Sequence, residues 1–513
     1  MKKLFNHWKL YVLAFLLVLS VALILRLISL TVLPVFADEA IYIRWSQVMA
    51  HEPTLRFLPL SDGKQPLFMW ILMFAVTRFN DPLFAGRLVS AFSGIGTMLG
   101  AGVLSYILFK SKKASVVAML IWAISPFTLF FDRMALVDAL LAFFAVWTAI
   151  FCVITARTRR LDTAMIGGFF LGGGLLTKSP ALFFVILIPA SFLFINYKSS
   201  RRAFAWLHLA GLFLVSLVIG YGMYNILRLG PNFQLIASRN LDYVYPITHI
   251  FQKPFDPFIP YLERAASWVW ILGPATIYLL AGVSLLFSLK RFPKQLFFLF
   301  AWIFIPIAVN AEFAKVFTAR YIFYTIPFFV ILASSGFAKI KIDKIILIIL
   351  IGFVIQSLYQ NYFLLTNPVK AYLPEEERSG YLEEWSAGTG IKQITDYLNL
   401  QHTQNPDTQI VVGTEGYFGT LPDGLQMYMQ NTPNVVVIGI GLSIKQLPDP
   451  LVEAKKSGDA TYLVINKSRL VGEPKDLGLK LIAQYPKELR TPGTHEFVQF
   501  GPQEILYFFQ VTN

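Results

Sequence analysis

Long apolar runs recur along the first 369 residues of this chain, separated by short charged breaks. Several runs reach about twenty residues, which is the length a helix needs to cross a hydrocarbon core of about 30 Å. The chain is 56% hydrophobic and only 14% charged, whereas a soluble domain has about a quarter of charged residues. These runs therefore predict a multi-pass α-helical membrane protein.

About eleven membrane spans are expected from runs of this length. They lie near 10–33, 83–109, 115–131, 137–156, 161–177, 180–196, 203–228, 265–289, 295–311, 320–338 and 344–365. Every second break is basic, and the positive-inside rule then places the N-terminus in the cytoplasm and the C-terminal segment outside the membrane. The basic breaks contain Lys2, Lys3, Lys9, Lys110, Lys112, Lys113, Arg157, Arg159, Arg160, Lys198, Arg201, Arg202, Lys290, Arg291, Lys294, Lys339, Lys341 and Lys344.

Charge is distributed unevenly between the two parts of the chain. The formal net charge is +14, yet residues 370–513 hold 12 Lys and Arg against 17 Asp and Glu. The basic excess therefore belongs to the membrane part, where it sets orientation, and we expect no nucleic-acid partner. The outer breaks hold the acids Asp38, Glu39, Glu52, Asp62, Asp81, Asp132, Asp138, Asp242, Asp256, Glu263 and Glu312. The orientation of the chain in the membrane does not require acidic residues on the outer side. These acids therefore indicate a function at the outer surface.

Composition changes after Lys370, and a two-domain organisation follows. The segments TQIVVGT, NVVVIGI and ATYLVIN are typical of buried strands, while GIKQITDYLNL and GLQMYMQN have the character of helices. We expect a transmembrane domain at 1–369, with a first outer loop at 34–82, and an extracytoplasmic α/β domain at 370–513. The first apolar run is too long for a signal peptide, so we expect a retained anchor.

An acidic pair, Asp38 and Glu39, stands where the first apolar run leaves the membrane. The following segment AIYIRWSQVMA has apolar residues at helical spacing, so a helix lying flat at the interface is expected. A plain helix cap explains one acid, because Asp is a good N-cap. A pair beside a membrane exit, where charge is costly, equally suits a catalytic function.

Cations also occur at the outer ends of different spans, against the positive-inside bias. They are Lys64, Arg133, Lys178, Lys315 and Arg320. Several such cations alongside acids indicate an anion site, and the anion found at that depth is a lipid phosphate. Structural explanations stand beside this one: Lys64 suits an interfacial anchor, Asp132 and Arg133 suit pairing with neighbouring helices, and Asp138 suits a helix N-terminus.

Cysteine and histidine indicate no cofactor. The single Cys152 excludes a disulfide framework, and the six His residues show no paired spacing, so neither a metal site nor a bound cofactor is indicated. The chain also has no P-loop or Gly-rich nucleotide motif.

The ordered motifs FADEAIYIRWSQVM, GKQPLFMW, SPFTLFFDRM with a following Asp, LTKSP and ARYIFYTIP resemble the GT-C glycosyltransferases. The similarity is to protein O-mannosyltransferases, lipid A aminoarabinose transferases and their bacterial relatives, and it runs over residues 1 to 340. It implies Asp38 as the catalytic base, next to Glu39. It also implies Lys64, Lys178 and Arg320 as donor phosphate-binding residues. Arg133 joins this set, and Asp132, Asp138 and Tyr321 are further candidates. Relatives often carry Glu-Lys-Pro-Pro or a His-Pro pattern where this chain has Gly63, Lys64, Gln65 and Pro66, and the missing acid weakens any inference of a metal site or a lipid A acceptor.

The resemblance implies an inverting membrane glycosyltransferase with a polyprenyl-phosphate sugar donor, mannose or another hexose being the sugar. The acceptor is a protein, a lipid or a glycan, and the sequence leaves this choice open. A transporter or a lipid-linked sugar flippase is the alternative, but it needs ionisable groups near mid-span and usually repeats, whereas the charges here lie at span ends. A scaffold that uses the outer domain as a binding module is a third alternative.

Overall fold

The computed structural model describes residues 2–196, 202–339 and 343–512, so Lys198, Arg201 and Lys341 of the basic breaks lie outside the described residues, as do the side chains of Lys2 and Lys3. The chain divides into two compact units. Unit 1 comprises Met1–Leu30, Thr54–Ile71 and Arg87–Pro374, and unit 2 comprises Thr31–Pro53, Leu72–Gly86 and Glu375–Asn513. The predicted boundary at 369 lies near the last of these divisions. Residues 34–53, assigned above to the membrane domain, cluster instead with the C-terminal part.

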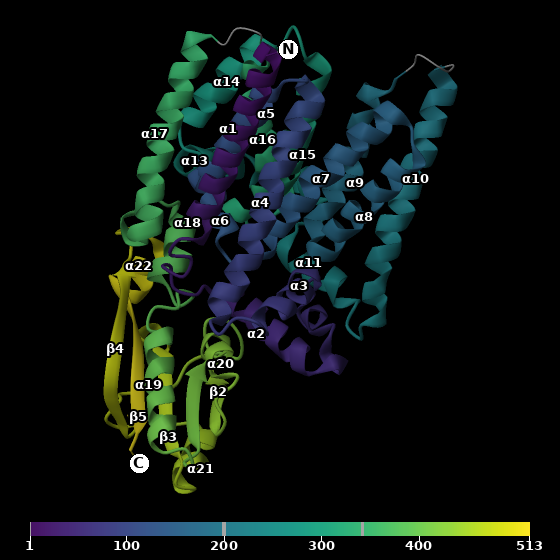
Figure 1. The fold of residues 1–513 in the computed structure, drawn as a ribbon. Helices are drawn as coiled ribbons and strands as arrows, with labels where there is room; N and C mark the ends of the chain where they lie inside the picture. The colour runs from purple at the N-terminus through teal and green to yellow at the C-terminus, as the bar shows by residue number, and fades with distance from the viewer. Residues whose placement is uncertain (1, 197–201, 340–342, 513) are drawn as a thin grey trace. The chain divides into compact units, whose positions relative to one another are not determined.

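The membrane part of the chain is helical, as expected (Figure 1). Six helices in the described residues are long and apolar enough to cross a membrane. They are α1 (Lys2–Leu27), α4 (Pro82–Phe109), α7 (Val137–Thr158), α10 (Arg202–Tyr224), α15 (Pro293–Phe313) and α17 (Lys344–Thr366). Each coincides with one of the predicted spans, because a run of apolar residues of this length satisfies both the helix and the hydrocarbon core.

Two further predicted spans are bent helix pairs. The pair α5 (Lys112–Ile124) and α6 (Pro126–Asp132) is bent by 61°, and α13 (Phe258–Leu272) and α14 (Thr276–Ser288) meet at 104°. Counting each pair as one span gives up to eight in the described residues. The other three predicted spans fall on the shorter apolar helical segments Leu161–Thr177, which is α8, Ser179–Phe194 and Phe323–Ala338, so the count of eleven stays a prediction.

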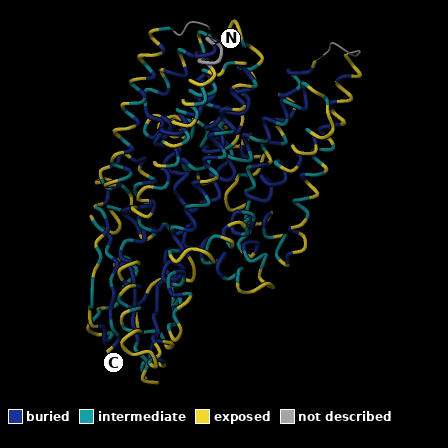
Figure 2. The backbone as a smooth tube through the Cα atoms, in the orientation of Figure 1, coloured by how far each residue is buried: buried dark blue, intermediate teal, exposed yellow. Residues whose placement is uncertain are grey.

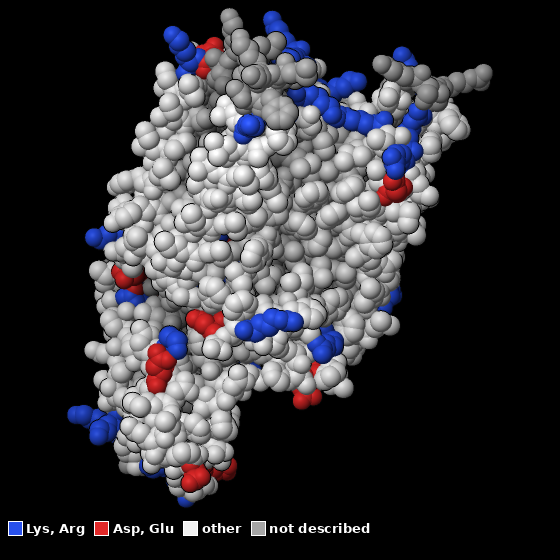
Figure 3. Space-filling model, viewed as in Figure 1, with Lys and Arg blue, Asp and Glu red and all other residues white. Residues whose placement is uncertain are grey.

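The helical unit exposes apolar rather than charged side chains along its length. Leu13, Leu207, Leu214, Ile348 and Ile355 on α1, α10 and α17 are all exposed, and these helices show yellow outer sides in Figure 2. Figure 3 shows a broad zone without Lys, Arg, Asp or Glu over the same helices. Such a surface is stable against lipid tails and not against water.

Unit 2 contains a five-stranded mixed sheet of order β2-β1-β3-β5-β4. The three strands β1 (Ile410–Glu415), β2 (Val435–Gly441) and β3 (Ala460–Asn466) are parallel and match the predicted strands. The strands β4 (Leu479–Leu489) and β5 (Gln503–Val511) are antiparallel additions that the sequence did not predict. Much of β4 is exposed and it carries Pro486, so its pattern lacks the continuous apolar run of a buried strand.

Helices cover both faces of this sheet (Figure 1). On one face Tyr397 of α19 (Ile391–Gln404) packs against Tyr462 and Phe508. On the other face, Leu451 of α21 (Asp449–Lys456) packs in a core cluster with Leu463 and with other strand residues on that side of the sheet. The remaining helices of unit 2 are α2 (Ala37–His51), α18 (Glu375–Arg378), α20 (Asp423–Met429) and α22 (His495–Phe500).

A buried ion pair ties α1 to the bent pair α5 and α6. Arg26 donates to Asp132 at 2.7 and 2.9 Å, Trp122 Nε1 donates to the same carboxylate at 3.2 Å, and both charged side chains are fully buried. Gly94 of α4 makes room for this carboxylate, since a Cβ atom there would lie 2.1 Å from Asp132 Oδ2. The sequence suggested pairing of Asp132 with a neighbouring helix, and its partner is Arg26.

We expect Gly94→Ala to lower the free energy of unfolding by about 1–3 kcal/mol, because the added methyl group forces Asp132 away from Arg26. The matched control is Gly211→Ala on α10, where nothing lies within 4 Å of the added Cβ. That control should be neutral or slightly stabilising, since Ala favours a helix by about 1 kcal/mol over Gly. Thermal unfolding of both variants in detergent measures the difference, and equal melting temperatures would contradict the steric argument.

Candidate functional site

The acidic pair lies in the first turn of α2, in unit 2, and its two members differ. Phe36 is the N-cap residue of this helix, so Asp38 is the second helical residue rather than the cap. Glu39 is buried, and its Oε2 accepts a hydrogen bond from the Phe36 amide at 3.0 Å. The capping function that the sequence allowed for Asp38 therefore belongs to Glu39. Asp38 is half-buried beside it.

Helix α2 packs on α20, so part of the apolar side that was expected to face the membrane interface faces protein. Ile41 and Met49 of its apolar side are buried within the protein. Arg44 donates to the side chains of Gln426 and Gln430, and Gln47 Nε2 donates to the Met427 carbonyl at 2.8 Å. The apolar periodicity was correct, but the surface that the helix covers is protein.

The start of α2 is joined to the segment that precedes α19. The Ser386 carbonyl accepts hydrogen bonds from the Ala37 amide at 3.1 Å and from Thr420 Oγ1 at 2.9 Å. The Phe36 ring stacks on Tyr381 with centroids 4.4 Å apart. Asp38 is therefore held on a backbone whose neighbours are fixed at several points.

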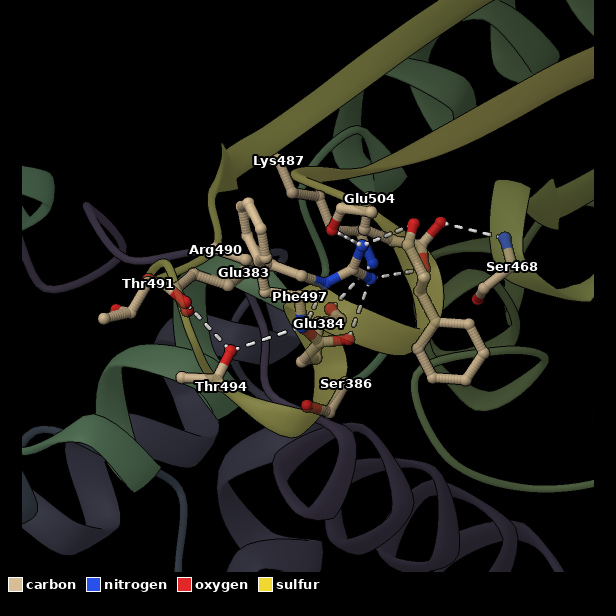
Figure 4. Close-up of polar contacts among 12 residues, drawn as sticks. Glu383, Glu384, Ser386, Ser468, Lys487, Arg490, Thr491, Thr494, Phe497 and Glu504 are labelled. Atoms are coloured by element: carbon tan, nitrogen blue, oxygen red, sulfur yellow. Dashed lines mark hydrogen bonds and ion pairs between the residues drawn. The ribbon is translucent and has the colours of Figure 1, made fainter.

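A buried guanidinium clamps the same segment (Figure 4). Arg490 binds Glu384 with Nε at 2.5 Å and Nη2 at 3.0 Å, and Nη2 also reaches Glu504 at 2.9 Å. Its Nη1 donates to the Phe500 and Gly501 carbonyls at 3.2 and 3.0 Å. All five N–H donors of this arginine are thus used, the strongest arrangement available to a guanidinium.

Two further charged groups are buried near this clamp. Burial lowers the pKa of Lys487 to about 8, against the opposing carboxylates of Glu504, Glu415 and Glu384, and its Nζ donates to the Glu384 carbonyl at 2.9 Å. Burial likewise raises the pKa of Glu415. The clamp and its neighbours form a charge cluster inside unit 2 that the sequence did not reveal.

Unit 1 brings together three of the four cations predicted to bind phosphate. Lys178, the C-cap residue of α8, lies over the Tyr321 ring at 4.8 Å from its centroid. The Arg320 guanidinium carbon lies 5.8 Å from the centroid of the same ring. Lys178 Nζ also donates to Oδ1 of the buried Asp138 at 2.7 Å. Tyr321 and Asp138, two of the further candidates, thus contact these cations directly.

Lys64 joins the same neighbourhood through its chain neighbour. Gln65 Nε2 donates to Ser179 Oγ at 2.8 Å, so the residues that follow Lys64 and Lys178 touch. Lys64 Nζ lies 3.3 Å from Asp62 Oδ2. Gly63 lets the chain turn here, because its φ is +66° and a Cβ atom would lie 2.7 Å from the Leu235 carbonyl.

Helix α11 (Leu235–Tyr243) adds residues that sequence reasoning missed. Arg239 pairs with Asp62 at 2.9 Å and with Asp242 at 2.8 Å, and Asn240 Oδ1 lies 3.4 Å from Ser179 Oγ. Four cations therefore lie on the segments of unit 1 that meet near Ser179 and Tyr321. They are Lys64, Lys178, Arg239 and Arg320. No motif in the sequence distinguishes Arg239 from an ordinary surface arginine.

Arg133 was expected to bind phosphate, but the structure shows it bound to backbone carbonyl groups. Its guanidinium is buried and donates to the carbonyl oxygens of Leu25, Arg26, Ile28 and Ser29 at 2.6–3.1 Å. These carbonyls close the C-terminal end of α1, where a cation is favoured by the helix dipole and by unpaired acceptors. The contacts of Arg133 and of Asp132 are structural, so neither enters the site that we propose.

No group of three His, Cys, Asp or Glu side chains that could hold a metal ion occurs in the part of the chain that the structure describes.

One protein family matches about a third of the chain. Residues 63–221 match the family model described as dolichyl-phosphate-mannose-protein mannosyltransferase. The matched segment includes Lys64, Arg133 and Lys178, while Asp38 precedes it and Arg320 follows it. No curated protein matches the chain in sequence.

Solved structures match over nearly the whole length. The crystal structure of ArnT from Cupriavidus metallidurans bound to undecaprenyl phosphate has a TM-score of 0.56 and 14% identity, covering 96% of this chain and 97% of that one. The Archaeoglobus fulgidus oligosaccharyltransferase tethered with an acceptor peptide has a TM-score of 0.50 and 14% identity, covering 89% and 69%. At such identities the likeness shows the fold.

Over residues 63–221 this chain is similar to the family of dolichyl-phosphate-mannose-protein mannosyltransferases, and its fold is similar to that of ArnT. The resemblance carried by the sequence motifs is thereby confirmed.

Proposed function

We propose that this protein transfers a hexose, mannose being the first candidate, from a polyprenyl-phosphate donor to an acceptor hydroxyl with inversion. The observation that carries the proposal is the contact of both Lys178 and Arg320 with Tyr321 in unit 1. The hydrogen bond from Gln65 to Ser179 brings the segment that carries Lys64 next to the segment that carries Lys178. These cations come from three distant segments, and their convergence suits a phosphate dianion, which prefers several charged donors.

Asp38 acts as the general base in this proposal. Its carboxylate takes the proton from the acceptor hydroxyl while that oxygen attacks the anomeric carbon. The bond between this carbon and the phosphate oxygen breaks on the opposite face, and the polyprenyl phosphate leaves with the electron pair. This is the single displacement of inverting glycosidases with a phosphate leaving group.

The cations stabilise the charge that develops on the leaving phosphate. Their half-buried setting makes each electrostatic interaction stronger than it is in open water. Asp138 and Asp62 hold Lys178 and Lys64 in place before the donor arrives, so little reorganisation is needed in the transition state. Glu39 supports the reaction indirectly by capping the helix that carries Asp38.

The similar structures support the choice of substrates. ArnT was solved with undecaprenyl phosphate and the archaeal oligosaccharyltransferase with an acceptor peptide. We assign to this chain the same kind of lipid donor, with the N-terminus in the cytoplasm and unit 2 outside, as the basic breaks indicate. The rival function is that of a transporter or flippase, which would move the intact donor lipid across the membrane.

The direct test incubates the purified protein with radiolabelled polyprenyl-phosphate mannose and a cell-envelope extract. Label that moves to an extract component, and releases polyprenyl phosphate in equal amount, supports the transferase. Movement of the intact labelled lipid across liposomes, without release of polyprenyl phosphate, would replace this proposal with the transporter.

Arg320→Gln should lower kcat/KM for the donor by about 10–100-fold, since a charged hydrogen bond contributes about 1.5–3 kcal/mol. The matched control is Lys315→Gln, which removes an exposed cation whose Nζ bonds the Leu241 carbonyl. That control should stay within about twofold of the native enzyme, because exposed charges contribute little. Equal losses in both variants would show a general effect of charge and contradict the assignment of Arg320.

A further inference from the structure

The parallel part of the unit 2 sheet contains a point at which ligands commonly bind. From β1 the chain goes to β2 on one side and then returns to β3 on the other, giving the order β2-β1-β3. In open α/β sheets ligands bind beyond the carboxyl ends of the strands where this change of direction occurs. Here that position lies beyond Glu415, the last residue of β1, and Asn466, the last residue of β3.

The two strand ends are joined by a buried carboxylate. Glu415 accepts hydrogen bonds from the Asn466 amide nitrogen at 2.6 Å and from Asn466 Nδ2 at 2.8 Å. Asn466 Oδ1 is buried and has no hydrogen-bond partner among the residues that the structure describes. This edge of the sheet is therefore rigid and retains an unused acceptor.

A short loop beyond β1 exposes two large aromatic side chains. Tyr417 is 67% and Phe418 is 64% exposed. Gly416 and Gly419, with φ of +73° and +115°, flank them and make the tight loop possible. The loop is pinned at its end because Asp423 Oδ2 accepts a hydrogen bond from the Gly419 amide at 2.7 Å. Large aromatic rings that stay exposed to water on a fixed loop gain no free energy from burial. Such exposed apolar surface is typical of a binding site.

Trp385 and Arg469 complete this surface. A Cβ atom on Gly419 would lie 3.6 Å from the Trp385 ring, so that ring lies against the end of the loop, and it is 42% exposed. The Arg469 guanidinium, from the turn after β3, is 5.7 Å from the centroid of the same ring. We call Trp385, Tyr417 and Phe418 the aromatic edge.

The aromatic edge and the proposed base are joined within unit 2. Trp385 stands between Glu384, which Arg490 clamps, and Ser386, whose carbonyl accepts from the Ala37 amide and from Thr420. Ala37 precedes Asp38, and Thr420 follows the loop that carries the aromatic rings. One carbonyl oxygen therefore couples the position of Asp38 to that of the aromatic edge.

We propose that the aromatic edge binds sugar rings of the acceptor, so that the acceptor is a glycan or carries one. The apolar C–H face of a pyranose packs on aromatic rings, and its hydroxyl groups suit an adjacent guanidinium. Arg469 supplies this guanidinium. Rigid Tyr and Trp side chains provide such contact area at a small entropic cost. The inference rests on the proposed function, in which Asp38 receives the acceptor proton.

Saturation-transfer difference NMR of the full chain in nanodiscs tests this inference. The probes are mannotriose, maltotriose and the trimer of N-acetylglucosamine. At least one should show transfer to its ring C–H protons, and the variant Tyr417→Ser/Phe418→Ser should weaken that binding by about tenfold or more. The control Tyr372→Ser, which removes an exposed tyrosine of unit 1, should leave it unchanged. Absence of transfer with all three probes, or equal binding by the double variant, would overturn the inference.

Hydrolysis of the labelled donor by water separates this inference from the proposed function. The double variant should hydrolyse the donor at the native rate while transferring less sugar to the envelope extract. If the native protein neither hydrolyses the donor nor transfers sugar, the proposed function fails, and the NMR result still decides whether the edge binds sugars.

A bilayer is the other surface that such rings could contact. Cys152 is buried and is the single cysteine of the chain, so a nitroxide attached in the variant Tyr417→Cys reports on that position alone. Faster collision of the label with a water-soluble nickel complex than with oxygen supports sugar binding. Faster collision with oxygen would place the loop in lipid and overturn the inference.

Discussion

Asp38→Asn is expected to lower sugar transfer by about 10²–10⁴-fold, the usual contribution of a general base. Asparagine has nearly the same shape as aspartate, so the variant should fold, bind the donor and lack only the carboxylate that accepts the proton. Transfer of label from polyprenyl-phosphate mannose, followed over time with matched protein amounts, measures the loss. Turnover within about tenfold of the native enzyme would reject Asp38 as the base.

Two other variants separate the carboxylate of Asp38 from its surroundings. Glu39→Gln keeps an oxygen that accepts the Phe36 amide, so its effect on transfer should be far smaller than that of Asp38→Asn. Asp396→Asn removes an exposed carboxylate paired with Lys392 on α19 and should leave transfer unchanged. A loss with Glu39→Gln as large as that with Asp38→Asn would return both acids to the catalytic site.

Arg490→Met is expected to lower the stability of unit 2 by about 3–5 kcal/mol, because it leaves the buried carboxylates of Glu384 and Glu504 without their cation. Transfer should fall as well, since Glu384 holds the segment that contacts the start of α2. Hydrogen exchange of the amides in β4 and β5 measures the local change in the intact protein. Protection equal to that of the native protein would contradict a structural function of the clamp.

A double-mutant cycle identifies the cause of this loss. Glu384→Gln combined with Arg490→Met should cost less than the two single losses added together, because fewer unpaired charges stay buried. Lys392→Met is the matched control: it removes a cation from an exposed pair on α19 and should change stability by about 0.5 kcal/mol or less. Additive losses in the cycle would mean that Glu384 and Arg490 act independently.

The elements predicted from sequence were those with a continuous local pattern. The three parallel strands were predicted because each is a short run of apolar residues, and β1 and β3 are almost entirely buried. Helix α19 was predicted from its helical periodicity and α20 from its position between two strands. Strands β4 and β5 were missed, because β4 is half-exposed and is interrupted by Pro486. Its assignment depends on pairing with β5, which in turn pairs with the distant strand β3.

The candidate site was predictable only in part. Lys178, Arg320 and Tyr321 stood out because two cations at the outer ends of spans conflict with the positive-inside rule, and they do lie together. Arg133 conflicted with the same rule, yet its guanidinium turns to the carbonyls at the end of α1. Arg239 was missed because surface helices commonly carry arginines that belong to no functional site, and nothing in the sequence sets this one apart.

The sequence by itself determined that this protein crosses a membrane and that its C-terminal part alternates strands and helices. These properties depend on the length and period of apolar runs, which are local. Only the tertiary structure decided that α2 packs on α20, that Glu39 rather than Asp38 caps it, and that Arg490 clamps Glu384. The reason is physical: hydrogen bonds and ion pairs between distant residues depend on side-chain direction and burial, which arise only when the elements pack.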